Sequence, residues 1–295
     1  MNDGWIYTDC INKASAGQTV LQYYTKNYYH STKIQWRERI QSRQILLEDK
    51  STTADTFLQA GQTLTYYRPP WKEPEVPLSF EVIYEDMDLL IVNKPSGLPV
   101  LPGGSFLQHT LLYRLQKRYP NGTPIPIHRL GRGTSGLMLL ARSKIARSRL
   151  SQQMRDRQIE KVYLAKASGI IERDSFSIRD RIGKIPHPVL GYIYGATSSG
   201  KDAYSKCRVI RHDHNYTIVE VTILTGRPHQ IRIHLAAVGH PLVGDPLYDV
   251  GGIPKISRHS GKLITPGDCG YELHAYKLGF KHPVSNRQLN FHVNR

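Results

Sequence analysis

Two segments of this 295-residue chain combine glycine, histidine and arginine in patterns that enzymes use. The first segment, residues 128–136, reads HRLGRGTSG and contains the spacing G-x-G-x-x-G. In a dinucleotide-binding fold that spacing follows a strand and opens a helix whose N-terminus holds the pyrophosphate. Here the preceding residues are rich in proline, and residues 136–141 have the apolar character of a strand. The sequence therefore argues against a dinucleotide site.

The second segment, residues 225–234, reads TGRPHQIRIH and is followed at residues 239–248 by GHPLVGDPLY. It brings His229, His234 and His240 close together in the sequence. Their spacings of five and six residues place no neighbouring pair on one face of a helix, and no H-E-x-x-H motif is present. We therefore expect these histidines to make hydrogen bonds and to bind no metal.

The chain carries a large positive charge, because 40 Lys and Arg residues stand against 24 Asp and Glu residues, a net charge of +16. Half of this excess falls in residues 128–166, where ten basic residues are opposed only by Asp156 and Glu160. Lysine and arginine gain free energy on nucleic acid by releasing the counterions condensed on its phosphates. An ordinary basic enzyme is the alternative, since net charge affects association and not fold. The clustering favours a nucleic-acid partner.

The sequence lacks the features of membrane and secreted proteins. No apolar run approaches the ~20 residues that a membrane span needs. The first ten residues, MNDGWIYTDC, have neither the basic end nor the apolar stretch of a secretory signal. Cys10, Cys207 and Cys269 lie far apart and form no C-x-x-C motif, which argues against a disulfide framework. We expect a cytoplasmic protein that does not bind membranes, and nothing here implies a protein partner.

A proline-rich segment at residues 68–79 divides the chain. Four prolines within residues 69–77 cannot lie inside a helix or a central strand, so this segment predicts a linker. It separates residues 1–67 from residues 80–295. The elements expected in the first part are two helices and two short strands, at residues 19–29, 31–42, 44–47 and 63–67.

The second of these helices carries basic residues that we expect to contact RNA. Its spacing predicts an apolar edge formed by Ile34 and Ile40. Arg37, Arg39 and Arg43 leave this edge basic. Residues 1–67 are therefore expected to form a small α+β RNA-binding module.

Residues 80–295 show more strands than helices. Residues 80–84 and 89–93 flank an acidic turn, and residues 205–211 and 216–224 flank another polar turn, which predicts two hairpins. The other expected elements are two strands and two helices, at residues 136–141, 162–167, 143–158 and 231–238. Hairpin connections favour a mixed, largely antiparallel sheet, and the fold class predicted for the chain is α+β.

Together, the two segments resemble signatures of the RluA-type pseudouridine synthases. In that family these signatures read close to H-R-L-D-x-x-T-S-G and T-G-R-x-H-Q-I-R-x-H, the latter followed by G-H-P-x-x-G-D. Supporting matches are NKPSGL at residues 93–98, KVYLA at residues 161–165, LHA at residues 273–275 and HP at residues 282–283. The resemblance covers residues 80–295, and residues 17–67 resemble the S-four-type RNA-binding domain that precedes many such enzymes.

The resemblance implies an enzyme that isomerises specific uridines of tRNA or rRNA without a cofactor. The bond between base and ribose breaks, the uracil turns, and it is rejoined through carbon. Tyr163 matches the tyrosine that stacks on the flipped base, Arg129 an arginine that helps to extrude it, and Arg232 the arginine that pairs with the catalytic aspartate. Flipping costs a few kcal/mol, and stacking can return about 1–3 kcal/mol. The further residues expected to contact substrate or RNA are His128, Leu130, Thr134, Arg227, His229, Arg147 and Arg155.

Gly131 stands where the family has its catalytic aspartate. Glycine can act neither as nucleophile nor as base, and a buried Arg232 without an acidic partner would be costly. We therefore expect a relocated acid. The candidates are Asp245 first, and then the hairpin residues Glu85, Asp86 and Asp88. The alternative is an RNA-binding protein that keeps the synthase fold but has lost catalysis.

Overall fold

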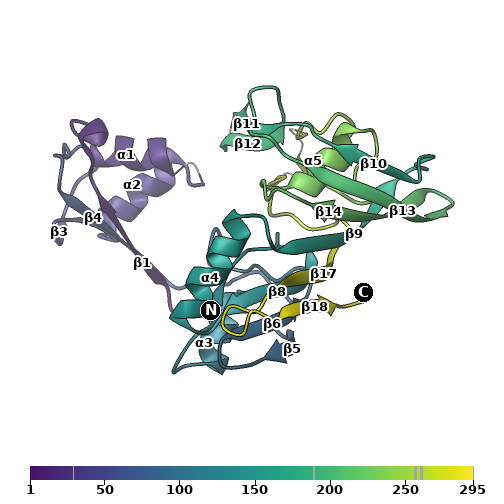
Figure 1. Ribbon diagram of the computed structural model, residues 1–295. Coiled ribbons are helices and arrows are strands. Elements are labelled where there is room, and N and C mark those ends of the chain that lie inside the picture. The colour runs from purple at the N-terminus through teal and green to yellow at the C-terminus, as the bar shows by residue number, and fades with distance from the viewer. Residues whose placement is uncertain (29, 189, 256–257, 260–261, 295) are drawn as a thin grey trace. The chain divides into compact units, whose positions relative to one another are not determined.

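The computed structural model describes residues 1–28, 30–188, 190–255, 258–259 and 262–294. The chain forms two compact units, Met1–Glu73 and Pro74–Arg295 (Figure 1). Their boundary lies within residues 68–79, the segment expected to be a linker. None of the helices in the described ranges is long and apolar enough to cross a membrane.

The N-terminal unit packs two helices on an antiparallel sheet with the strand order β1-β4-β2-β3. Its helical and extended elements are η1 (Lys13–Ser15), α1 (Val20–Asn27), α2 (Lys33–Gln41), β1 (Trp5–Cys10), β2 (Ile45–Leu47), β3 (Lys50–Ser51) and β4 (Thr63–Arg68). Each α-helix begins with a capping box, in which a threonine and the glutamine three residues later cap each other's backbone amides. Both predicted helices are thus confirmed, although Tyr29 lies outside the described residues.

The core of this unit is aromatic, and it corrects the orientation predicted for α2. Trp36 is 1% exposed and lies against Tyr24 and Tyr66. Ile40 is buried beside it as expected, but Ile34 is 70% exposed. The helix therefore turns its Trp36 edge inward, because the indole buries far more apolar surface than an isoleucine side chain.

The second unit is built on a ten-stranded sheet whose main path is β10-β13-β14-β9-β17-β8-β6-β5, with β18 on β17 and β7 on β8. Strands β17 and β8 pair in parallel, and the other pairings described for this sheet are antiparallel. The predicted mixed, largely antiparallel sheet is therefore confirmed. The strands of the unit are β5 (Glu81–Glu85), β6 (Leu89–Lys94), β7 (Ile125–Pro126), β8 (Ser135–Ala141), β9 (Glu160–Ser168), β10 (Ser175–Ile178), β11 (Ile182–His187), β12 (Gly191–Ala196), β13 (Ser205–Asp213), β14 (Tyr216–Ile223), β15 (Arg258–His259), β16 (Lys262–Leu263), β17 (Leu273–Lys281) and β18 (Gln288–His292).

Helices cover both faces of the sheet, which explains the unbroken apolar run at residues 89–92 of β6. Leu89 and Ile91 of β6 pack in a cluster with α4 (Lys144–Arg155). The alternate residues Leu90 and Val92 pack in a second cluster, with α3 (Leu111–Arg118) and α5 (Gln230–Ala237). Successive side chains of a strand point to opposite faces, so a strand covered on both sides needs an unbroken apolar run.

The close pairing of β8 with β17 explains one glycine of the G-x-G-x-x-G segment. Gly136 has a φ of +107°, and a Cβ there would lie 2.3 Å from the carbonyl oxygen of Ala275. The last glycine therefore allows two backbones to meet. A strand follows it, and this arrangement agrees with the argument against a dinucleotide site.

Candidate active site

The second unit contains a cavity of about 820 Å³ beside the loop that precedes β8. Five segments form its wall, and they come from distant parts of the sequence. They lie within residues 99–102, 128–134, 154–163, 223–232 and 266–273. The two motif segments identified in the sequence, residues 128–136 and 225–234, therefore meet at one site.

The wall of this cavity is strongly cationic. Among the described residues that line it, none is Asp or Glu. The cationic side chains on the wall are Arg129, Arg132, Arg155, Arg157, Lys161, Arg227 and Arg232. A concave surface with this charge attracts phosphate-bearing molecules and adds to the basic character read from the sequence.

Arg232, in α5, is held by a buried ion pair. Its Nε and Nη2 atoms each donate to Asp245 over 2.7 Å, and the side chains of Arg232 and Asp245 are 3% and 0% exposed. The Asp245 carboxylate also accepts the backbone amides of Leu247 and Tyr248. Burial disfavours the charge of Arg232, but the hydrogen bonds and charge of Asp245 outweigh burial and raise its pKa. The predicted need for an acidic partner of Arg232 is met by Asp245.

The contacts of Asp245 also test its predicted role as a relocated catalytic acid. Its carboxylate oxygens are engaged by a guanidinium and two amides, and Asp245 is absent from the described residues that line the cavity. Asp245 therefore holds Arg232 in place from outside the described cavity wall. Its role as a catalytic acid stays a prediction, and this position argues against it. The hairpin candidates are engaged elsewhere: Glu85 pairs with Arg142, Asp86 with His282, and Asp88 with Ser143.

The histidines of the motif segments and His240 have hydrogen-bonding roles. His128 Nε2 accepts the backbone amide of Leu139, and His229 Nδ1 lies 2.8 Å from the hydroxyl of Tyr248. Burial lowers the pKa of both His128 and His229 to about 4. His234 contacts Ser205 and the carbonyl of Asp180, and His240 contacts the carbonyl of Ser168. These contacts confirm the expected hydrogen-bonding role of the three histidines.

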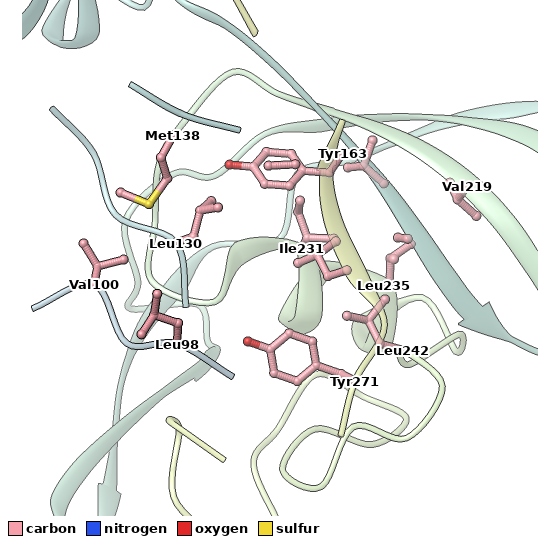
Figure 2. Close-up of a cluster of buried hydrophobic side chains, with 14 of the residues drawn as sticks. Leu98, Val100, Leu130, Met138, Tyr163, Val219, Ile231, Leu235, Leu242 and Tyr271 are labelled. Carbon is pink, nitrogen blue, oxygen red and sulfur yellow. The ribbon is translucent and has the colours of Figure 1, made fainter. Parts of the chain in front are cut away.

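Two tyrosines line the cavity. Tyr163 lies on β9, and Tyr271 lies just before β17, the strand that pairs with β9. Figure 2 shows both rings with their hydroxyls directed toward the side of the cluster where Leu98 and Leu130 lie. Tyr163 is 7% exposed and Tyr271 is 6% exposed, yet both line the cavity. Burial raises the pKa of each hydroxyl, so both are neutral phenols near neutral pH.

The loop at residues 128–134 is held by hydrogen bonds from the NKPSG segment, residues 93–97. Lys94 is fully buried and its Nζ donates to the carbonyl oxygens of Leu98 and Arg132. Ser96 Oγ donates to the carbonyl of Gly133 over 2.7 Å. These contacts hold the loop backbone at Arg132 and Gly133, directly after Gly131, so the NKPSG segment positions the loop.

The other site residues predicted from the sequence fall into two groups. Leu130, Thr134, Arg155 and Arg227 line the cavity with the groups already described. Arg147 is exposed on α4 and is absent from the described residues of the cavity wall.

The predicted RNA contacts of the N-terminal unit lie on or just after α2. Arg37 and Arg43 are exposed, whereas Arg39 stacks on Trp36 at 4.4 Å. Arg39 therefore offers less of its surface to a partner than the sequence suggested.

Sequence reasoning missed several residues of the wall, chiefly Lys161, Arg132 and Tyr271. Lys161 lies in the KVYLA segment at residues 161–165, in which only Tyr163 is a predicted site residue. Tyr271 belongs to no motif, and its hydroxyl meets Thr134 across 137 positions of sequence. No spacing rule could bring these two residues together, because their contact depends on the parallel pairing of β8 with β17.

Comparison with known proteins identifies relatives along most of the chain. A family model described as RNA pseudouridylate synthase matches residues 88–237. An uncharacterized RNA pseudouridine synthase of Synechocystis is 49% identical over 89% of this chain and 89% of its own length. RNA pseudouridine synthase 5 of Oryza sativa is 40% identical over 98% of this chain and 86% of its own. The solved structure of human RNA pseudouridylate synthase domain containing 1 covers 76% of this chain and 86% of its own, with 25% identity and a TM-score of 0.58.

Proposed function

The chain belongs to the RNA pseudouridylate synthase family and isomerises uridine in RNA to pseudouridine, and we propose that the cavity around Arg232 performs this reaction. The observation that carries the proposal is a cationic cavity, bordered by two tyrosine rings, in which Arg232 is fixed by buried Asp245. The relatives' names describe synthases, which favours catalysis over an RNA-binding protein that has lost it.

Substrate capture requires that the uridine leave the base stack, at a cost of a few kcal/mol. Arg129 is exposed, lines the cavity and would fill the gap that the base leaves. The ring of Tyr163 would stack on the uracil, which returns about 1–3 kcal/mol. The remaining arginines of the wall would hold the flanking phosphates, because a guanidinium matches phosphate geometry.

The chemistry needs stabilisation of a negatively charged base. When the bond between ribose C1′ and uracil N1 breaks, the electron pair leaves with the uracil. A positive group already in place lowers the energy of that charge without reorganisation at the moment of reaction. Arg232 fits this role, because Asp245 fixes its orientation while its raised pKa keeps it charged.

We also propose that the N-terminal unit binds RNA as an S-four-like module. Its exposed Arg37 and Arg43 support this role, together with Arg39, which stacks on Trp36. A second binding unit on the same chain raises the effective concentration of the substrate at the cavity. Without this unit, RNA affinity should fall more than the rate of the bound complex.

The test is to map pseudouridine across total RNA from cells with the gene, without it, and with a rescue copy. One or more sites that vanish on deletion and return on rescue would support the proposal and identify the RNA as tRNA or rRNA. The same total RNA, taken from the deleted cells, is the substrate for the purified full chain. If neither experiment produced pseudouridine at any site, the function would be that of an RNA-binding protein.

A further inference from the structure

The hydroxyl of Tyr271 occupies the space that a side chain at position 131 would fill. A Cβ on Gly131 would lie 2.9 Å from Tyr271 Oη and 3.5 Å from Thr134 Oγ1. A Cβ on Gly133 would lie 2.9 Å from Cζ of the same ring. Neither Gly131 nor Gly133 has a positive φ, so it is the tyrosine ring, and not the backbone conformation, that leaves no room for a side chain here.

The surroundings of this hydroxyl are those of a reacting group. Tyr271 Oη lies 3.3 Å from Thr134 Oγ1, and the guanidinium carbon of Arg232 lies 4.1 Å from the centre of the ring. The side chain is 6% exposed and still lines the cavity. A phenolate formed at this position would be stabilised by the adjacent positive charge, which is itself fixed by Asp245.

The reaction requires a proton carrier. Pseudouridine has a hydrogen on N1 that uridine lacks, and it has lost the hydrogen from C5. The described wall offers no carboxylate for this transfer. One nitrogen of each wall histidine is engaged within the protein, because His128 Nε2 accepts a backbone amide and His229 Nδ1 bonds to Tyr248. The proposed function assigns the ring of Tyr163 to stacking, and Tyr271 is the wall residue whose hydroxyl lies against position 131.

We propose that Tyr271 is a catalytic residue that carries the proton between C5 and N1 of the uracil, in the place that an acidic side chain at position 131 would otherwise occupy. This proposal rests on the proposed function, because it assigns a group to that reaction. After the C1′–C5 bond has formed, the phenol gives its proton to N1. The phenolate then takes the proton from C5, and the tyrosine returns to its starting form. Both ring positions adjoin C6, so one oxygen atom can serve both.

The test compares Tyr271→Phe with Tyr248→Phe in the full chain. Tyr248 is a matched control, because its ring is also buried and lies 4.9 Å from the Arg232 guanidinium, but it is absent from the described cavity wall. The readouts are the single-turnover rate on the mapped RNA, the Kd for that RNA and the melting temperature. General acid–base catalysis is worth about 10²–10⁴-fold, so Tyr271→Phe should lose a factor of that size with its Kd unchanged. Tyr248→Phe should stay within about threefold of the natural chain, since its hydroxyl makes two hydrogen bonds within the protein, with His229 Nδ1 and the carbonyl oxygen of Tyr194, and lies outside the described cavity wall.

A second variant keeps the test decisive if Tyr271→Phe does not fold. Replacement of Tyr271 by 3-fluorotyrosine changes the acidity of the phenol and almost nothing of its shape. A carrier of the proton would shift the alkaline limb of the pH–rate profile to lower pH, whereas a packing residue would leave it unmoved. An unmoved profile, or a Tyr271→Phe rate within threefold of the natural chain, would overturn the role of Tyr271 alone. An inactive natural chain would overturn the proposed function as well, so the two failures are distinguishable.

Discussion

The buried ion pair between Arg232 and Asp245 makes the substitution Asp245→Asn informative. Asparagine has nearly the same shape, so it can still accept the amides of Leu247 and Tyr248, but it cannot neutralise the guanidinium. Arg232 would then be a buried charge without an anionic partner, because its remaining contacts are a carbonyl of Pro266 and aromatic rings. Removing one member of a buried pair costs about 3–5 kcal/mol.

The assay is thermal and urea unfolding of the full chain, with the transition of the second unit followed separately. For a unit of this size, 1 kcal/mol shifts the melting temperature by about 2–4 °C, so Asp245→Asn should lower it by about 6–20 °C. The control is Asp202→Asn, which makes the same change in an ion pair whose side chains are 52% and 86% exposed. That substitution should cost less than about 1 kcal/mol. If the two variants lost the same free energy of unfolding, the Arg232–Asp245 pair would contribute no more to stability than an exposed ion pair, and the reasoning would be refuted.

Three further predictions concern the cavity. Gly131→Ala should destabilise the second unit by about 1–3 kcal/mol, because the added methyl group meets the Tyr271 hydroxyl. In a Tyr271→Phe background the same substitution should cost clearly less. Equal costs in the two backgrounds of this double-mutant cycle would contradict the contact. Burial lowers the pKa of His128 and His229 to about 4. Below about pH 6.5 the unfolded chain therefore takes up protons at these histidines while the folded chain does not. The free energy of unfolding should fall as the pH is lowered from about 6.5 to 4, by up to about 1.4 kcal/mol per pH unit for each histidine. Urea titrations of His128→Gln should show a shallower slope, and an identical slope would remove His128 from this account. RNA affinity should fall steeply with salt. If Arg155 binds one phosphate, Arg155→Gln should reduce the slope of log affinity against log salt concentration by about 0.7–0.9. A slope equal to that of the natural chain would show that Arg155 does not contact a phosphate.

Local chemistry in the sequence predicted much of the fold. The helical character of residues 19–29 and 31–42 predicted α1 and α2, and alternating or unbroken apolar runs predicted β6, β8 and the β13–β14 hairpin. These signals are readable because periodicity and burial depend on residues close in sequence. Strand β1, helix α3 and the β17–β18 pair were not anticipated. β1 is an edge strand with little buried surface and thus little pattern, and β17 is recognisable only beside β8 and β9.

The sequence by itself determined the family, the cationic character of the site and most of its members, because long motifs keep residue type and spacing together. It also showed that Gly131 left Arg232 in need of an acidic partner. Only the tertiary structure decided how that need is met. Asp245 pairs with Arg232 from outside the described cavity wall, and the hydroxyl of Tyr271 fills the space beside Gly131. The physical reason is that the Tyr271 contact joins segments 137 positions apart that the β8–β17 pair brings together, and the Arg232–Asp245 contact depends on how the chain folds back after α5. Neither contact follows from periodicity along the chain.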